Sequence, residues 1–271
     1  MAFEWKPLIK SVLIPPLDVV DRVVRGVAGP HDVPPFRIRV RNGVFAYLDA
    51  RRWVRIGDQM RDELRTFVDL RPEHEVLEIG CGPGIAARSL KAFLGSGSYT
   101  GLDIDATSIA WCRQNYASDR VRFVHQDLAQ AFYNPGGSEE TVRTPLPFDT
   151  ACFDRAFTIS VFTHLYPDEI SHYLGEIRRV LRPGGSCLAT LLIKDRFVAS
   201  QSRIPFRHEI DADLLAWNAE MPTKAIAHSA AVLARIAEDG GMRIRSIAPG
   251  SWDGTTQASY FHDMIVFEPL A

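Results

Sequence analysis

The residues best suited to chemistry form a glycine-rich turn after a short apolar stretch. Residues 76–84 read VLEIGCGPG, with glycines at 80, 82 and 84 and an acid, Glu78, two positions before the first of them. Glycines let the backbone turn tightly and approach a ligand closely, and a helix beginning after them offers free N–H groups. We therefore predict that a small molecule binds at this turn.

Two further acids follow the turn at nearly equal intervals. Asp103 lies 23 residues after Gly80, in the segment YTGLDID, and Asp127 lies 24 residues after Asp103, in HQDL. A carboxylate at Asp103 can accept hydrogen bonds from both hydroxyls of a ribose. Asp127 can accept one from an adenine amino group, with Leu128 beside the ring. The alternatives are a helix cap or solvated turn for Asp103 and a plain loop residue for Asp127.

The spacing of the glycines separates two kinds of nucleotide ligand. Dinucleotide sites have the pattern G-x-G-x-x-G, which this turn lacks. Glu78 would repel a pyrophosphate, whereas it would attract the ammonium and sulfonium groups of S-adenosylmethionine (SAM). The charges therefore favour SAM over NAD. Cys81, inside the turn, is interpreted as a small packing residue rather than a nucleophile.

These residues have to be positioned by the strands and helices that alternate from Glu75 onward. The expected strands are 76–79, 99–104, 121–125, 155–159, 187–193, 243–247 and 264–267, and the expected helices are 58–70, 85–93, 107–116, 168–181 and 229–239. Such alternation predicts βαβ crossovers and a doubly wound α/β sheet. The linker between the last two strands is too short for a crossover helix, so we predict an antiparallel pair.

Together the motifs resemble those of class I SAM-dependent methyltransferases. The resemblance rests on residues 76–84, 101–105, 125–128, 153–165 and 178–185. It implies a three-layer α/β fold with a seven-stranded, mostly parallel sheet of order 3-2-1-4-5-7-6, the seventh strand being antiparallel. It also implies methyl transfer from SAM, which becomes S-adenosylhomocysteine. The cofactor contacts that it implies are Glu78, Gly80, Cys81, Gly82, Gly84, Asp103, Ile104, Asp127, Leu128 and Ser160.

The methyl acceptor is expected to be a small molecule that attacks through oxygen. An alcohol or phenol loses a proton as it attacks, so a nearby base helps. His164, four residues beyond Ser160, is the best-placed candidate, with a structural or substrate-lining role as the alternative. The segment SVFT at 160–163 lacks the N-P-P-Y type signature of enzymes that methylate nucleic-acid amino groups. Because Ser160 stands where a metal-binding carboxylate would be needed, we also predict no metal.

Two stretches lie outside the alternating pattern. Residues 1–57 are expected to form a mostly helical extension that covers the site, ahead of a methyltransferase domain at 58–271. Residues 194–228 are an expected insertion or lid, whose aromatic side chains either line an apolar acceptor site or simply pack onto the core. The basic stretch RIRVR at 37–41 is interpreted as a solvated face, with a patch for an anionic substrate as the alternative.

The composition is that of an ordinary globular protein. The 271 residues are 46% hydrophobic and 24% charged, which argues against disordered, collagen-like and disulfide-scaffold proteins. A net charge of −2 gives no overall attraction for nucleic acid. The four cysteines are expected to be reduced thiols, and no stretch resembles a bilayer span or a signal peptide, so we predict a cytoplasmic protein without stable membrane insertion.

Other functions and the oligomeric state stay open at this point. The alternatives to a methyltransferase are a catalytically silent SAM-binding regulatory protein and, less favoured, a nicotinamide-dependent oxidoreductase. The sequence leaves open the identity of the acceptor and the number of subunits.

Overall fold

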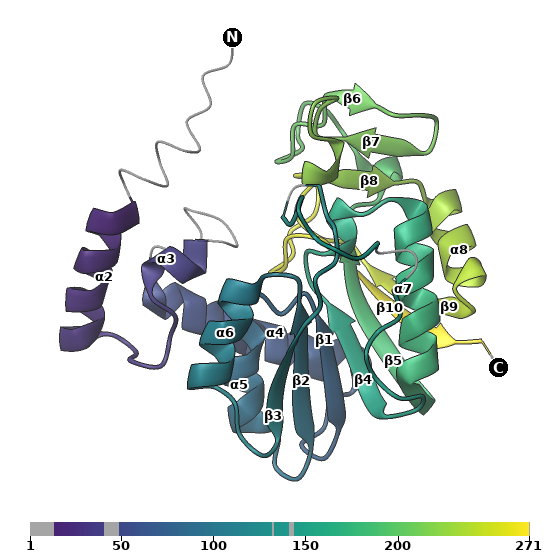
Figure 1. Ribbon diagram of the computed structural model, residues 1–271. Coiled ribbons are helices and arrows are strands. Elements are labelled where there is room, and N and C mark those ends of the chain that lie inside the picture. The colour runs from purple at the N-terminus through teal and green to yellow at the C-terminus, as the bar shows by residue number, and fades with distance from the viewer. Residues whose placement is uncertain (1–13, 41–48, 132, 141–143, 271) are drawn as a thin grey trace.

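A seven-stranded sheet with helices on both faces forms the centre of the molecule (Figure 1). The computed structural model describes residues 14–40, 49–131, 133–140 and 144–270. The strands are β1 (Glu75–Ile79), β2 (Ser98–Asp103), β3 (Val121–His125), β4 (Phe153–Thr158), β5 (Leu181–Leu191), β9 (Met242–Ala248) and β10 (Asp263–Pro269). Their order is β3-β2-β1-β4-β5-β10-β9, with β10 antiparallel to both neighbours, which confirms the predicted topology.

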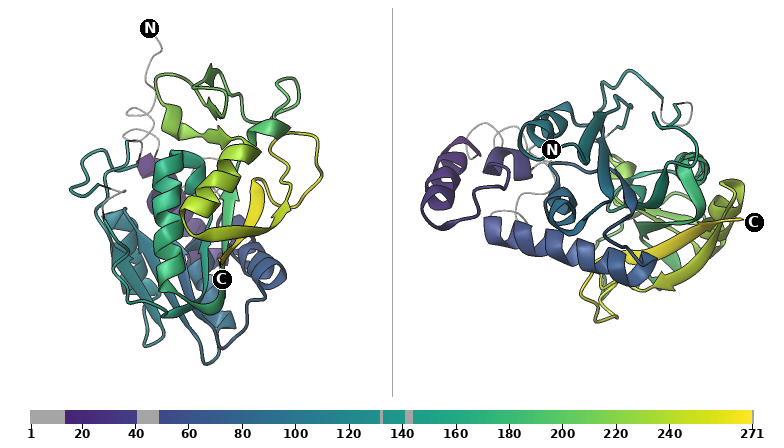
Figure 2. Two further views of the ribbon diagram at one scale, coloured as in Figure 1. Left: turned by 90° about the vertical axis from the view of Figure 1, so that its right-hand side faces the viewer. Right: turned by 90° about the horizontal axis from the view of Figure 1, so that it is seen from below.

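The helices form a layer on each face of the sheet (Figure 2). They are α4 (Ala50–Val68), α5 (Ile85–Phe93) and α6 (Ala106–Asn115) on one face, and α7 (Pro167–Val180) and α8 (Ala230–Asp239) on the other. Each layer buries its own apolar cluster against the strands. Parallel strands covered on both faces send their carboxyl ends to one edge, where ligands bind in such sheets.

Helix α4 begins eight residues earlier than the sequence indicates. Asp49 accepts a hydrogen bond from the backbone N–H of Arg51 and so caps the helix. The first turns bury Trp53, and Gly57 packs so closely on α5 that an added Cβ would lie 2.3 Å from the carbonyl oxygen of Ile85. The close approach of the two helices explains why a glycine persists inside this helix.

The insertion contains a second, small sheet that the sequence does not predict. Its strands are β6 (His208–Glu209), β7 (Leu214–Ala216) and β8 (Ile226–His228), each too short to show alternation. The aromatic side chains of the insertion pack in a separate cluster around Trp252. Phe206 makes an edge-to-face contact with Trp252, and Phe197 makes one with Phe206. These aromatics therefore hold the insertion together, as the packing alternative proposes.

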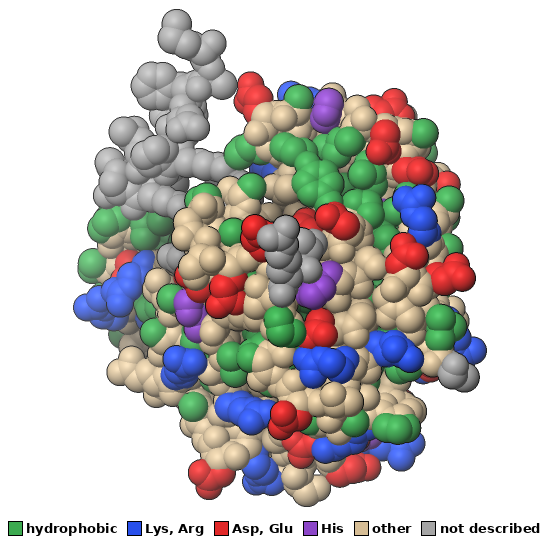
Figure 3. Space-filling view, turned by 45° about the vertical axis from the view of Figure 1, so that its right-hand side comes forward, with side chains coloured by type: hydrophobic (Ala, Val, Ile, Leu, Met, Phe, Trp, Pro, Cys, Tyr) green, Lys and Arg blue, Asp and Glu red, His purple; other side chains and the backbone are tan. Residues whose placement is uncertain are grey.

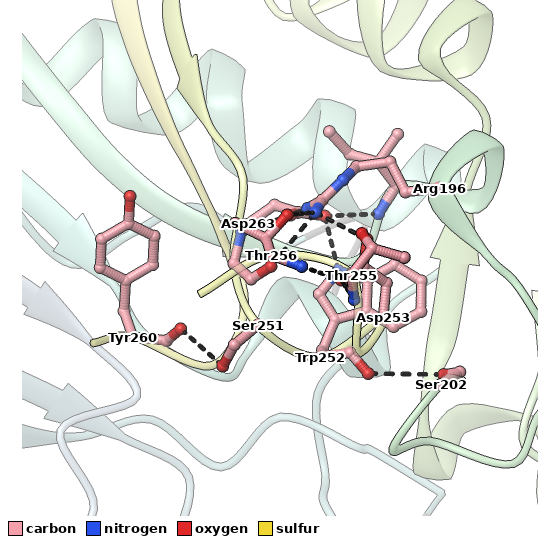
Figure 4. Close-up of polar contacts among 11 residues, drawn as sticks. Arg196, Ser202, Ser251, Trp252, Asp253, Thr255, Thr256, Tyr260 and Asp263 are labelled. Carbon is pink, nitrogen blue, oxygen red and sulfur yellow. Dashed lines mark hydrogen bonds and ion pairs between the residues drawn. The ribbon is translucent and has the colours of Figure 1, made fainter. Parts of the chain in front are cut away.

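A buried charge cluster fastens the insertion to the returning strand (Figure 4). Arg196, in the short helix η5 (Lys194–Arg196), pairs with Asp253 at 2.7 Å and also with Asp263 at the start of β10. Asp263 is fully buried and also accepts hydrogen bonds from the backbone of Ile193 and from the indole of Trp252. One guanidinium thus faces two carboxylates, and hydrogen-bond donors stabilise the negative charge that remains.

We expect Arg196→Met to lower the free energy of unfolding by about 3 kcal/mol, because it leaves buried carboxylates without their cation. The melting temperature should fall by roughly 10 °C. Arg243→Met is the matched control, because Arg243 pairs with Glu268 while 64% of its side chain is exposed. Its effect should stay below about 1 kcal/mol. Denaturant unfolding measures both, and equal losses would contradict a special role for the cluster.

The N-terminal part adds two helices beside the α5–α6 layer, α2 (Ile14–Ala28) and α3 (Phe36–Arg39). The loop between them contacts the end of the sheet that carries the glycine turn. Asp32 accepts a 2.7 Å hydrogen bond from Arg88 in α5, and its carbonyl accepts one from the hydroxyl of Tyr116. Among the described residues, no helix is both long and apolar enough to cross a bilayer.

Candidate functional site

The glycine turn joins β1 to α5 in a backbone conformation that suits only glycine. Gly80, Gly82 and Gly84 have φ angles of 79°, 48° and 79°, all in the left-handed region. A Cβ on Gly80 would lie 2.2 Å from Val161, so the turn also packs directly against the segment after β4. Cys81 is buried inside the turn with its Sγ 3.7 Å from the carbonyl of Gly82, and burial raises the pKa of its thiol. These features fit the packing role expected of Cys81.

Asp103 lies at the end of β2, directly beside the turn. One carboxylate oxygen accepts the backbone N–H of Gly82 at 2.6 Å, and the other accepts that of Asp105 at 2.7 Å. Burial raises the pKa of Asp103 to about 6, and the two N–H donors oppose this effect. Each oxygen keeps a second lone pair, so the carboxylate can still accept two ribose hydroxyls. Asp105 caps α6 by accepting the N–H of Thr107.

Glu78 lies inside the protein beneath the turn. It is almost completely buried, and its carboxyl accepts a hydrogen bond from the hydroxyl of Tyr99 on β2. Burial raises the pKa of Glu78 to about 8, with an added contribution from the nearby Asp103. The free protein therefore holds a proton here at neutral pH. A ligand cation would stabilise the ionised form.

We predict that the protein becomes less stable between about pH 4.5 and pH 8. The raised pKa means that folded Glu78 binds a proton more tightly than the unfolded chain does, so unfolding releases one in this window. The free energy of unfolding should fall by roughly 4 kcal/mol as pH rises through it. Glu78→Gln should remove most of this slope above pH 6. Urea unfolding at several pH values tests this, and parallel curves for both proteins would contradict it.

The other residues that are expected to hold the adenosine part of SAM lie at the ends of β2 and β3. Both carboxylate oxygens of Asp127 are engaged with a following loop, by Asn134 at 2.9 Å and by the hydroxyl of Ser138 at 2.9 Å. Leu128 is buried in the core, and Ile104 packs against the same cluster. Asp127 thus organises the loop, and its contact with an adenine amino group stays a prediction.

A neighbouring side chain at the end of β3 has an unused hydrogen-bond acceptor. The Nε2 of Gln126 donates to the carbonyl of Pro145 at 2.8 Å, whereas its buried Oε1 has no partner within the described part of the chain. A buried polar atom of this kind calls for a partner that the described residues do not supply. Together with Glu78, Asp103 and the glycine turn, this free acceptor is consistent with the binding of a nucleoside that carries a positive charge at its other end.

Ser160 lies two residues after the end of β4 in an unusual backbone conformation. Its φ of 58° lies in the left-handed region, and its backbone N–H donates to the side chain of Thr190 at 2.7 Å. Its hydroxyl lies 3.4 Å from Nδ1 of His262, in the loop before β10. Burial lowers the pKa of His262 to about 4, with a further effect from His164. His262 was not singled out in the sequence, because only the fold brings it beside Ser160.

His164 ends the short helix η4 (Phe162–His164) and is oriented by the insertion. Its Nδ1 lies 3.0 Å from the carbonyl of Thr223, and because a carbonyl only accepts, Nδ1 must carry the proton. In the neutral ring Nε2 is therefore an acceptor, and the hydroxyl of Tyr133 lies 3.3 Å from it. Burial lowers the pKa of His164 below its usual value, so the ring stays neutral at pH 7.

Two hollows on the described surface lie elsewhere. One lies between α2 and the start of α4, and the other lies between α4 and residues 259–260. Neither is lined by the glycine turn or by His164. Among the described residues, no three metal-ligating side chains converge.

Comparisons with known proteins place the site in context. Residues 76–185 match the family model described as a methyltransferase domain. A probable phthiotriol/phenolphthiotriol dimycocerosates methyltransferase 2 of Mycobacterium ulcerans is 36% identical over 110 residues, which are 41% of this chain and 36% of that protein. A fatty-acid O-methyltransferase of Mycolicibacterium smegmatis is 35% identical over 115 residues, 42% and 36% of the two chains. The chain thus matches little more than a third of the length of these relatives.

Solved structures with low sequence identity share the fold. The PH0226 protein from Pyrococcus horikoshii has a TM-score of 0.55 and 16% identity, over 83% of this chain and 94% of that chain. The glycopeptide N-methyltransferase MtfA has a TM-score of 0.52 and 16% identity, over 79% and 90% of the two chains. The cyclase SpnF reaches the same TM-score and identity over 79% and 81%. These similarities establish the fold and leave the reaction to the site itself.

Proposed function

We propose that the protein transfers a methyl group from SAM to an oxygen of a small molecule, because residues 76–185 match the methyltransferase domain model and the sheet has the strand order expected of a class I SAM-dependent methyltransferase. The observation that carries the choice of oxygen is the neutral His164, whose Nε2 already lies beside a hydroxyl, that of Tyr133. An attacking hydroxyl in that position could pass its proton to His164.

The donor half of the site is proposed to hold SAM through charge and close backbone approach. Asp103 would accept the ribose hydroxyls, and Glu78 would ionise as the cationic end of the ligand approaches. The left-handed turn at Gly82 leaves no side chain between backbone and ligand. When bound, SAM supplies a methyl group whose leaving group is already activated, so the protein mainly aligns the reactants and excludes water.

The acceptor is proposed to be lipid-like, with a hydroxyl or carboxyl group as its reactive end. The names of the two curated relatives support a lipid, since one refers to phthiotriol dimycocerosates and the other to fatty acids. The insertion aromatics do not add to this argument, because they are occupied with one another and with Trp252. A carboxylate attacks without losing a proton, whereas an alcohol needs a base, so only an alcohol gives His164 a chemical task.

The transfer assay uses SAM labelled in its methyl group and three acceptors of equal chain length: a fatty alcohol, a fatty acid and a fatty amine. We expect label in the alcohol product, as an ether that survives alkaline hydrolysis, while a methyl ester would release it. Labelling of the amine alone would contradict attack by oxygen. SAM binding by calorimetry without label in any acceptor would favour the regulatory alternative.

A further inference from the structure

Helix α2 exposes an apolar face that no described element covers. At about 100° per residue its apolar side chains fall on one continuous arc. They are between 39% and 83% exposed and comprise Leu17, Val19, Val20, Val23, Val24 and Val27. Three of them also line a hollow of about 440 Å³ beside the start of α4. A contiguous exposed apolar face of this kind favours an interaction site.

The polar face of the same helix is held against the protein, so the orientation of α2 is fixed. The buried carboxylate of Asp18 accepts the backbone N–H of Arg37 at 3.0 Å. Asp21 pairs with Arg25 at 2.8 Å and with the fully buried Arg39 at 2.5 Å. These ion pairs lower the pKa of Asp21. Because the charged side is the anchored one, the valines cannot turn inward without breaking this cluster.

Exposed positive side chains lie beside the apolar face. Asp18 is buried and pairs with both Arg22, at 3.9 Å, and Arg37, at 3.3 Å, so these two side chains, which are 70% and 58% exposed, carry one positive charge more than it balances. Residues 1–57 contain ten of the chain's 31 lysines and arginines but only five of its 33 acids. In the space-filling view, hydrophobic side chains gather at the edge where α2 lies, with Lys and Arg next to them (Figure 3).

We propose that α2 docks this face on an anionic lipid bilayer surface. Valines and a leucine flanked by arginines suit the boundary between acyl chains and negatively charged headgroups, where an amphipathic helix lies parallel to the surface. A nucleic acid would use the arginines and leave the valines in water. The docking needs no transmembrane helix, and it stands independently of the methyl transfer proposed above.

The test measures co-sedimentation of the full chain with phosphatidylcholine vesicles, with and without phosphatidylglycerol. We expect binding to the anionic vesicles that weakens at high salt, because ions screen the arginines. Val19→Glu combined with Val23→Glu should lower the apparent affinity at least tenfold, and Arg22→Ser should lower it about fivefold. The matched control is Val198→Glu, because Val198 is 40% exposed on the distant insertion. It should bind like the unmodified protein.

Two further measurements decide whether a loss of vesicle binding comes from the apolar face of α2 itself. Calorimetric titration with SAM should give the same affinity for all variants, which shows that each is folded and separates this test from the proposed activity. Vesicle binding that survives the double valine substitution would overturn the proposal. Two other outcomes would overturn it as well. In one, the protein binds no vesicles but forms a dimer that the double substitution dissociates; in the other, it binds duplex DNA instead of vesicles.

Discussion

Asp103→Ala is expected to lower the affinity for SAM about a thousandfold. Two charge-assisted hydrogen bonds to the ribose would be lost, each contributing about 1.5–3 kcal/mol. The same substitution removes the acceptor that holds the N–H of Gly82 at 2.6 Å, so the glycine turn loses its support as well. Calorimetric titration with SAM and with S-adenosylhomocysteine measures the effect.

Two variants separate the ligand role of Asp103 from a structural one. Asp103→Asn keeps an acceptor oxygen without the charge, so we expect an intermediate affinity. Asp105→Ala is the neighbouring control, because it removes the cap of α6, bonded to Thr107 and Ser108, and leaves the Asp103 carboxylate in place. It should cost about 1 kcal/mol of stability with little change in SAM affinity. Equal SAM affinities for Asp103→Ala and the unmodified protein would refute the ribose contact.

His164→Ala should reduce kcat for a hydroxyl acceptor by about 10²-fold to 10³-fold with little change in SAM affinity, because the proton of the attacking hydroxyl loses its acceptor. The base must be neutral to act. Since burial lowers the pKa of His164, activity should be constant around pH 7 and fall only below pH 6.5. Steady-state kinetics across this range measure both features.

His262→Ala is the matched comparison for His164. His262 faces the hydroxyl of Ser160 at 3.4 Å, while His164 faces that of Tyr133 at 3.3 Å. We expect the His262 variant to change KM more than kcat. The ring of His262 lies beside Ser160, whereas the insertion orients the ring of His164, through Thr223. Should His262→Ala lose kcat and His164→Ala keep it, the base has been assigned to the wrong ring.

The arrangement of the glycine turn and Asp103 could be predicted from the sequence because its signals are local. Glycines spaced two apart, a buried strand before them and an acid at the end of the next strand all lie within about 25 residues of each other. The structure brings Gly82 and Asp103 into direct contact, as the register of parallel strands requires. Short apolar runs of four to seven residues, alternating with helical periodicity, were also enough to place every strand of the main sheet.

The acceptor half depends on contacts that sequence spacing does not reveal. Ser160 meets His262 across 102 residues, and His164 meets Thr223 across 59. The strands β6 to β8 have two or three residues each, too few for a pattern. Asp127 shows the same limit on a smaller scale. Its spacing predicts an adenine contact, which stays a prediction, and does not reveal its partners Asn134 and Ser138 in the following irregular loop.

The Arg196 cluster lies outside the part of the chain that matches the methyltransferase domain model. The family match ends at residue 185, and every member of the cluster lies beyond it, from Ile193 to Asp263. The part of the chain beyond the family match thus carries an ion-pair cluster that joins the insertion to β10 of the main sheet. A change in this cluster is therefore expected to loosen the insertion and the start of β10 together, while the contact between Gly82 and Asp103 stays in place.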